Sequence, residues 1–380
     1  MSILPLLADA PRPTDAGAPD EGALLAWFRR TGPVLVGFSG GVDSSYLAAV
    51  AVDALGPSAV LAVVGRSASY PLEQWRVARA IADRCAIPVV ELDTHELDDP
   101  RYAANPTNRC YFCKSELWTR LAPLAAARGM TLVDGTNADD LADWRPGAAA
   151  AREHGVRSPL AEFGFTKADV RRASAARALP TADRPSAPCL ASRLPYGTPV
   201  TVARLRRVER AEAGLRAIGI EGDLRVRHHG DLARIELAPA ALDARWTADG
   251  LGEMAAAVAA ADYAEVAVDL LGFRSGSLNL LAGVGVRPGA GGHGLASHRP
   301  ASSPATSPAP PSIALAASVT VERRGALALL RPTRPLAALL PLGRAALRTV
   351  PVPEGCTHVA LCIGERRSPA AALSTPDDRR

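Results

Sequence analysis

The chain is predicted to have an α/β fold, with a parallel sheet in its first half and a smaller α+β domain after it. Between about residues 21 and 185, short apolar runs alternate with helical patterns, which is typical of a parallel sheet covered by helices. Farther along, two runs of alternating polarity are separated by Gly230 and Asp231, which indicates a β-hairpin. A chain of 380 residues with 48% apolar content is also long enough to bury two cores.

The first domain contains four apolar runs of strand length. They are Val34–Phe38, Val60–Val64, Pro88–Leu92 and Thr131–Asp134. The helices expected between them are Ser44–Leu55, Leu72–Cys85 and Ser115–Arg128. This alternation predicts parallel strands with helices on both faces of the sheet, and it places a bound nucleotide at the carboxyl ends of the strands.

The second domain follows a proline-rich loop at about residues 180–200. Its expected elements are a helix over Thr201–Ile218, strands over Leu224–His229 and Leu232–Leu237, a helix over Ala240–Ala261 and a strand over Glu265–Leu270. The two strands joined by Gly230 and Asp231 form the hairpin, and the remaining elements complete a small α+β unit.

Changes in composition divide the chain into five parts. We expect a flexible N-terminus at 1–20, the α/β domain at 21–185, the α+β domain at 186–283, a disordered linker at 284–311 and a tail at 312–380. The linker is rich in Gly, Ser, Pro and Ala, so it has little to bury. The tail has no aromatic residue and no role that its sequence indicates, and its Cys356 and Cys362 are interpreted as incidental thiols.

Composition also excludes several classes of partner. Of the 43 basic residues only Lys114 and Lys167 are lysine, so an arginine-rich composition explains the net charge of +4 as well as nucleic-acid binding does. We expect no nucleic-acid partner and no membrane partner. The chain shows no signal segment and no apolar run near the ~18 residues of a membrane span, so we expect a cytoplasmic protein. In that reducing compartment, the six cysteines indicate metal-binding or catalytic thiols rather than disulfides.

A glycine-rich loop joins the first predicted strand to the first helix. Residues 38–45 read Phe-Ser-Gly-Gly-Val-Asp-Ser-Ser, an arrangement that points backbone N–H groups and a helix N-terminus at an anion. Gly40 and Gly41 allow close approach of phosphate oxygens, and the hydroxyls of Ser39, Ser44 and Ser45 add donors. The loop lacks the Gly-Lys-Ser/Thr ending of a Walker loop. An ordinary glycine turn before a helix is the alternative.

This loop resembles the SGGxDS loop of the PP-loop pyrophosphatases, which have a Rossmann-like sheet. The resemblance implies that the chain binds ATP and splits it between the α and β phosphates. Asp43 is then placed to hold Mg²⁺ against the phosphate oxygens, and Asp140 is a second, weaker candidate for the metal.

Three cysteines form the second candidate site. Cys110 and Cys113 make a C-x-x-C pair, which alone is compatible with a redox site, half a zinc site or iron–sulfur ligation. Cys189 lies in a rigid proline-rich loop, and Arg193 four residues later could lower the pKa of its thiol. Three thiolates would leave one iron of a cubane cluster without a protein ligand, free to bind sulfide or substrate.

With these cysteines, the chain resembles the LarE family of ATP-dependent sulfur transferases, which build the nickel-pincer cofactor of lactate racemase. The resemblance runs from about Leu24 to Asn279. Its blocks are residues 39–45, Asn108–Lys114, Asp134–Asn137, Asp143–Gly147, Arg157–Leu160, Cys189–Gly197, Val226–His229 and Gly272–Gly276. It implies that ATP adenylates a carboxylate of pyridinium-3,5-biscarboxylic acid mononucleotide and that sulfur then replaces AMP to give a thiocarboxylate.

The resemblance also implies the source of sulfur. Family members with three cysteines are thought to carry a 4Fe–4S cluster, here on Cys110, Cys113 and Cys189, that delivers an added sulfide. Members with only the cysteine that matches Cys189 sacrifice its sulfur and end as dehydroalanine. The cluster route is our hypothesis for this chain, and the sacrificial route is the alternative.

The substrate of this family is a small anionic nucleotide, so arginines are expected around it. Arg225 and Arg227 alternate onto one face of their strand and suit a phosphate, although solvated strand-face arginines are the plain alternative. Arg193 and Arg274 are further candidates, and Glu212 matches an acidic family position near the active site. Members of the family are expected to be homo-oligomers.

Three other functions share some of these features. A PP-loop tRNA thiolase would act on RNA, for which a strongly basic surface is expected. A PP-loop amidotransferase or ligase would need a glutaminase, whose nucleophile motif is not found in the sequence. A protein that binds iron–sulfur or zinc and uses ATP only structurally would release no pyrophosphate.

Overall fold

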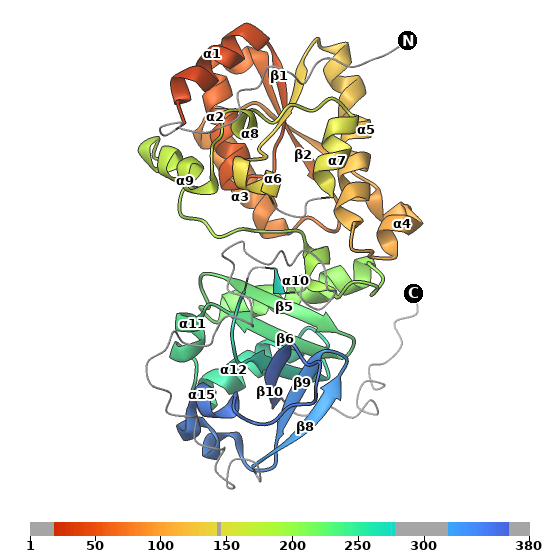
Figure 1. The fold of residues 1–380 in the computed structure, drawn as a ribbon, viewed down its shortest axis with the longest axis vertical. Helices are drawn as coiled ribbons and strands as arrows, with labels where there is room; N and C mark the ends of the chain where they lie inside the picture. Colours follow the sequence, from red (N-terminus) through yellow and green to blue (C-terminus); the bar gives the residue numbers. More distant parts are fainter. Residues whose placement is uncertain (1–18, 143–145, 275, 278–317, 365–380) are drawn as a thin grey trace, which may run out of the picture. The chain divides into compact units, whose positions relative to one another are not determined.

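The computed structural model describes residues 19–142, 146–274, 276–277 and 318–364 (Figure 1). Its residues form two compact units. The first unit comprises residues 1–191 and 197–202, and the second comprises 192–196 and 203–380. The flexible segment expected at 1–20 lies almost wholly outside the described residues, and the linker expected at 284–311 lies entirely outside them.

The first unit contains a sheet of four parallel strands in the order β3-β2-β1-β4. The strands are β1 (Val34–Gly37), β2 (Val60–Arg66), β3 (Val89–Asp93) and β4 (Thr131–Asp134). Val34 of β1 lies opposite Val60 on one side and Thr131 on the other, so β1 is central. All four carboxyl ends therefore lie at one edge of the sheet, as the fold prediction requires.

Helices cover both faces of this sheet. On one face, side chains of α1 (Glu21–Thr31), α2 (Val42–Leu55) and α3 (Leu72–Arg84) share a core with alternate residues of β1 and β2. On the other face, α5 (Arg109–Ala127) and α7 (Gly147–Glu153) pack on Leu35, Leu61 and Leu132. The remaining short helices are α4 (Pro100–Ala103), α6 (Ala138–Ala142), α8 (Pro159–Glu162) and α9 (Lys167–Ala176). The predicted α/β architecture is confirmed.

The second unit contains a six-stranded mixed sheet in the order β5-β6-β7-β10-β9-β8. The predicted hairpin is present as β5 (Leu224–His229) and β6 (Leu232–Leu237), which pair antiparallel, and β7 (Glu265–Asp269) pairs parallel to β6. One face is covered by α10 (Val202–Ala217), α11 (Pro239–Ala244) and α12 (Ala248–Ala259), whose apolar residues share one core with the strands.

The C-terminal tail supplies half of this sheet. Its strands are β8 (Val319–Arg324), β9 (Leu327–Pro332) and β10 (His358–Gly364), with a short helix α15 (Gly343–Leu347) between β9 and β10. β10 pairs antiparallel with β7, and Leu330 and Leu361 lie in the same core as the hairpin. The described part of the tail is therefore integral to the second unit, although its sequence did not indicate a role.

Three local predictions differ from the structure. The single helix expected over 240–261 is instead two helices, α11 and α12. The second begins after Thr247, whose side chain caps it by accepting a hydrogen bond from the Gly250 N–H. The helix expected from Ser115 begins at Arg109, so the C-x-x-C pair lies in its first turn. The loop after Cys189 contains a single 3₁₀ turn, Leu190–Arg193. Among the described helices, none is both long and apolar enough to cross a membrane.

Candidate active site

The glycine-rich loop connects β1 to α2 at the carboxyl edge of the first sheet. Gly40 has φ +64°, and a Cβ on it would lie 2.6 Å from the Cβ of Ala78, so only glycine fits there. Gly41 is the N-cap of α2 and provides no side-chain cap, which leaves the first N–H groups of this 14-residue helix to a ligand or water.

Tyr70, which precedes α3, and Gln74, which lies in α3, hold the glycine-rich loop in place. The side chains of Tyr70 and Gln74 both donate hydrogen bonds to the carbonyl oxygen of Ser39, at 2.9 and 2.8 Å. The hydroxyls of Ser39 and Ser44 lie 3.2 Å apart, and the Gly41 N–H donates to the former. Ser45 is fully buried, and its hydroxyl finds no partner among the described residues, so its predicted role in ATP binding stays a prediction.

The Asp43 side chain is held by two residues that sequence reasoning did not select. Its Oδ1 accepts a hydrogen bond from Asn137 Nδ2 at 3.2 Å, and its Oδ2 accepts one from Lys167 Nζ at 2.5 Å. Asn137 follows β4, and Lys167 begins α9 behind a Thr166 capping box. The sequence contained one signal that could have identified Lys167, because it is one of only two lysines in the chain.

Asp140 lies on α6 beside the same asparagine. Its Oδ2 accepts a hydrogen bond from the Asn137 N–H at 3.2 Å, and its own N–H donates to Asn137 Oδ1. The carboxylates of Asp43 and Asp140 thus both contact Asn137. The role of Asp140 as a metal ligand stays a prediction.

All three candidate cysteines belong to the first unit. Cys110 and Cys113 are three residues apart in the first turn of α5, on one face of the helix. Cys189 lies at the start of a loop that backbone hydrogen bonds tie down on both sides. The Leu190 N–H donates to the Ser69 carbonyl at 2.8 Å, and the Gly197 N–H donates to the Asn105 carbonyl at 2.9 Å.

Arg109 connects this loop to α5. Its side chain is buried, and its Nη1 donates to the Ala191 carbonyl at 3.1 Å and to Asn105 Oδ1. Asn105 adopts φ +57°, which asparagine tolerates, and its Nδ2 donates to the Thr198 carbonyl at 2.8 Å. Arg109 and Asn105 therefore hold the Cys189 loop against the turn that carries Cys110.

The three thiols influence one another electrostatically. Although residue Cys110 is exposed, desolvation of its sulfur by the surrounding protein raises the pKa of the thiol, and the Cys189 sulfur raises it further. Burial likewise raises the pKa of Cys113, as do the Glu96 carboxylate and the Cys189 sulfur. None of the cysteines is in a disulfide. Among the described residues, the three sulfurs do not form a set within 4.8 Å of one another, so these thiols do not preform a site for a single zinc ion.

The remaining three cysteines lie away from this loop, and Cys356 among them is half-buried. Cys85 is half-buried at the end of α3 and packs against the first core. Cys362 is buried in β10, where Arg331 Nη1 contacts its sulfur at 3.6 Å.

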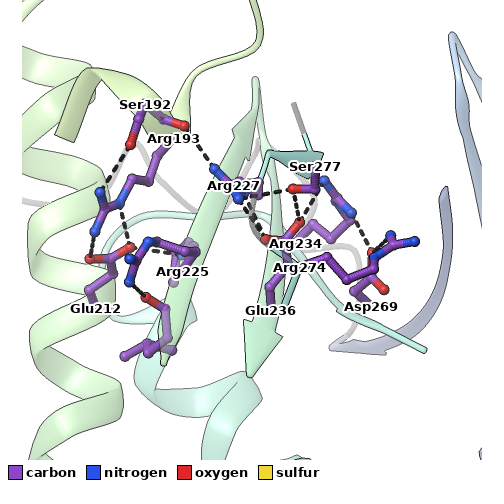
Figure 2. A network of polar contacts seen from close by, with 12 residues as sticks. Ser192, Arg193, Glu212, Arg225, Arg227, Arg234, Glu236, Asp269, Arg274 and Ser277 are labelled. Carbon is purple, nitrogen blue, oxygen red and sulfur yellow. Dashed lines mark hydrogen bonds and ion pairs between the residues drawn. The ribbon is translucent and has the colours of Figure 1, made fainter. Parts of the chain in front are cut away.

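The predicted substrate arginines of the second unit lie in a polar network (Figure 2). Arg193 makes a bidentate ion pair with Glu212, in which both N–O distances are 2.9 Å. Although burial alone would raise the pKa of Glu212, the Arg193 guanidinium and the Val226 N–H lower it overall. Glu212 is therefore a half-buried ion-pair partner, with 17% of its side chain exposed.

Arg225 and Arg227 are interior residues as well, with 5% and 6% exposure, so the alternative of solvated strand-face arginines is wrong. Arg225 lies over the Phe273 ring at 5.0 Å and donates to the Leu224 carbonyl. Arg227 donates to Glu236 at 2.9 Å, to the Ser192 carbonyl at 2.8 Å and to the Ser277 hydroxyl at 3.0 Å.

The network continues through Arg234, Glu236 and Asp269, which were not selected from the sequence, to the predicted Arg274. Arg234, which is fully buried, pairs with Glu236 at 3.0 Å and with Asp269. Arg274 contacts Asp269 at 3.8 Å. Each buried carboxylate of this network contacts an arginine, because an unpaired charge inside the unit would be costly. The network therefore supplies fixed guanidinium groups suited to an anionic ligand.

Comparisons with known proteins give three relatives and one family. The NAD synthase family matches residues 29–109. An uncharacterized Synechocystis protein, slr1717, is 45% identical over 257 residues, which are 67% of this chain and 95% of the relative. The pyridinium-3,5-bisthiocarboxylic acid mononucleotide synthase of Lactiplantibacillus plantarum is 34% identical over 264 residues, 69% of this chain and 94% of the relative. An uncharacterized Methanocaldococcus jannaschii protein, MJ0830, is 28% identical over 209 residues, 54% of this chain and 77% of the relative.

Proposed function

The chain belongs to the LarE-like family of PP-loop enzymes for ATP-dependent sulfur insertion, and from this we propose that its substrate is pyridinium-3,5-biscarboxylic acid mononucleotide. In the proposed reaction, a substrate carboxylate is adenylated and sulfur then replaces AMP to give a thiocarboxylate. The observation that carries this proposal is the relative named as the bisthiocarboxylic acid mononucleotide synthase, which this chain matches over 94% of its length.

The first step activates a carboxylate. A carboxylate oxygen attacks the α-phosphorus of ATP, a new P–O bond forms, and pyrophosphate leaves with the electrons of the broken P–O bond. The free N–H groups at the start of α2 and the ammonium of Lys167 would hold the phosphate oxygens during this step. Without activation, sulfur would have to displace oxide, which is a very poor leaving group.

Mg²⁺ fits the same site. Asp43 offers a carboxylate that now contacts an amide and an ammonium, both of which a metal and the phosphates could replace. Bound Mg²⁺ would neutralise negative charge on the phosphates. Asp140 remains the candidate for a second ligand.

The sulfur centre is proposed to be a 4Fe–4S cluster on Cys110, Cys113 and Cys189. The residues fit this group, because none of the three cysteines is in a disulfide, all three lie in one unit, and the Cys189 loop is fixed to the turn that bears the other two. Such a cluster would deliver sulfide at its iron without a protein ligand. In the alternative, the Cys189 thiolate attacks the adenylate, AMP leaves, and the Cα proton and Cβ–S bond are then lost to give dehydroalanine.

The arginines of the second unit are proposed to bind the anionic substrate. Arg225 lies over the Phe273 ring at 5.0 Å, and Arg193 is paired with Glu212. Burial lowers the pKa of Arg225 to about 10, so the side chain remains charged at neutral pH. Arg225 and Arg227 suit a phosphate, and the ion pair of Arg193 with Glu212 would position strand β5, which carries Arg225 and Arg227.

We also expect a homo-oligomer, which light scattering of the purified protein would test.

The test combines turnover with anaerobic analysis of the purified full chain. Pyrophosphate release should require pyridinium-3,5-biscarboxylic acid mononucleotide and should not respond to tRNA. Release that depends on tRNA, or on neither compound, would contradict the proposed substrate.

The sulfur route is tested separately. Reconstituted protein should contain iron and sulfide that are lost in Cys110→Ala and Cys113→Ala. If the protein remains free of iron and its mass at Cys189 falls by one H₂S after turnover, the sacrificial route holds instead.

A further inference from the structure

A buried cluster of charged and polar side chains lies where β6, β7 and β10 meet in the second unit. We call it the Asp269 cluster, and it consists of Arg227, Arg234, Glu236, Asp269, Arg274 and His358 (Figure 2 shows all but the last). One ligand atom from each of Glu236, Asp269 and His358 lies within 4.8 Å of the other two. All three of these residues are buried.

The charges of the Asp269 cluster do not cancel. Three guanidinium groups, of Arg227, Arg234 and Arg274, face two carboxylates, which leaves one positive charge in excess. Arg234, Glu236 and Asp269 are fully buried. An excess charge in such surroundings is strongly unfavourable unless an opposite charge joins it.

Three nitrogen atoms of His358 and Arg274 also lack hydrogen-bond partners among the described residues. His358 is 1% exposed, and its Nδ1 lies 2.9 Å from the Thr357 hydroxyl, but its Nε2 has no partner among the described residues. Arg274 Nε is likewise buried and unpartnered within that part of the chain, and Arg274 Nη2 has only its 3.8 Å contact with Asp269. Buried donors of this kind are normally satisfied, so the cluster can donate hydrogen bonds to a group outside the described residues.

The net charge of the Asp269 cluster decides whether a cation or an anion fits there. Two carboxylates and an imidazole could in principle hold a cation, but both carboxylates already accept from arginines and the cluster is already positive. A divalent cation would enlarge the excess, whereas one anionic group would remove it. Arg274 retains 23% exposure of its side chain, so solvent reaches this edge of the cluster.

We propose that the Asp269 cluster is an anion-binding subsite in which Arg274 and His358 hold one carboxylate or phosphate group of the substrate. The inference rests on the proposed function for the identity of that substrate. His358 lies in β10, so the C-terminal tail contributes a binding group as well as three strands. The sequence alone could not indicate this role, because His358 and Asp269 are 89 residues apart and meet only through the β7–β10 pairing.

The experiment is a calorimetric titration of the full chain, without ATP, with inorganic phosphate and with pyridine-3,5-dicarboxylate. The wild type should bind at least one probe, and the probe that binds identifies the group as phosphate or carboxylate. Arg274→Gln and His358→Leu should each weaken that binding by about tenfold or more, because each removes a hydrogen bond to a charged group. Arg348→Gln, an exposed arginine of the same tail, should leave the affinity unchanged.

Asp269→Asn tests whether the negative charge of Asp269 opposes anion binding. Removing a competing negative charge should strengthen anion binding, whereas general damage to the second unit would weaken it. The proposal is overturned if the wild type binds neither probe, if Arg274→Gln and His358→Leu keep the wild-type affinity, or if Asp269→Asn weakens binding. Because no ATP is present, these outcomes are separate from pyrophosphate release, whose failure would contradict only the proposed reaction.

Discussion

The two units hold their candidate functional groups in different ways. In the first unit, Asp43 and Lys167 pair at the carboxyl edge of the sheet with side chains that are 20% and 34% exposed. In the second unit, Arg234 and Glu236 pair with no exposure at all. The first unit therefore presents charges that a ligand can reach, and the second unit builds charges into its core.

This difference separates activity from stability. A partly exposed ion pair contributes little to folding, so its members are available to exchange partners with ATP and metal. Buried pairs behave otherwise, because removal of one member leaves a charge without solvent or partner. We therefore expect substitutions in the first unit to change chemistry and those in the second to change stability, and four predictions test that expectation.

The largest effect is expected for Arg234→Met. This change leaves the buried carboxylates of Glu236 and Asp269 short of a partner, and it should lower the free energy of unfolding of the second unit by about 3–5 kcal/mol. Hydrogen exchange followed by mass spectrometry reports on each unit separately. Faster exchange confined to the second unit is expected, and a loss below about 1 kcal/mol would contradict a stability role for the network.

The second prediction concerns acid. Burial lowers the pKa of His228 from 6.5 to about 4 and that of His229 to about 3, and arginines, among them Arg207 and Arg234, add to the effect. Burial and the nearby Arg234 and Arg274 lower the pKa of His358 to about 2. The folded second unit thus binds fewer protons than the unfolded chain between these values and 6.5.

The lowered pKa values of these histidines make the second unit less stable in acid. Stability should be complete above about pH 6.5 and should be lost as pH falls toward 4, by up to about 1.4 kcal/mol per pH unit for each histidine. Urea unfolding between pH 7.5 and 5 measures this slope. His228→Gln should flatten it, and an unchanged slope in that variant would mean that this histidine is not held neutral.

The sequence predicted the first unit far better than the second, and the reason is the range of the interactions. Each strand of the first sheet is an apolar run of its own, and the loop at 38–45 lies between a strand and a helix that it borders. Local pattern therefore sufficed for the parallel sheet and for the glycine-rich loop. Asn137 and Lys167 were missed because they reach Asp43 from 94 and 124 residues away.

The second unit depends on pairing that no local pattern specifies. β10 lies between β7 and β9 in the sheet, yet no sequence pattern between Asp269 and His358 predicts that β7 and β10 pair. Arg225 and Arg227 alternate like surface residues, and only the tertiary structure shows that Phe273 and Glu236 cover them. Buried ion pairs are thus the part of a candidate site that sequence reasoning is least able to separate from a solvated face.

The third prediction tests whether the first unit also contains one interior charge of structural value. Arg109→Lys removes the geometry by which one guanidinium reaches both Asn105 and the Ala191 carbonyl. Loss of these contacts should release the Cys189 loop by about 1.5–3 kcal/mol and speed amide exchange over 189–200 by about 10- to 100-fold. Arg101→Lys, an exposed arginine near the same helix, is the control. Unchanged protection of the loop would show that its backbone hydrogen bonds are sufficient.

The smallest effect on stability is expected for Asp43→Asn, because the ion pair that it removes is partly exposed. The free energy of unfolding should change by no more than about 1 kcal/mol, while pyrophosphate release should be abolished because the substituted amide is a poor ligand for Mg²⁺. Asp53→Asn, on the same helix α2, should change neither quantity. Release that survives in Asp43→Asn but not in Asp140→Asn would transfer the metal to Asp140. A large loss of stability in Asp43→Asn would instead remove the contrast between the two units, since the pair with Lys167 would then be a folding contact like those around Arg234.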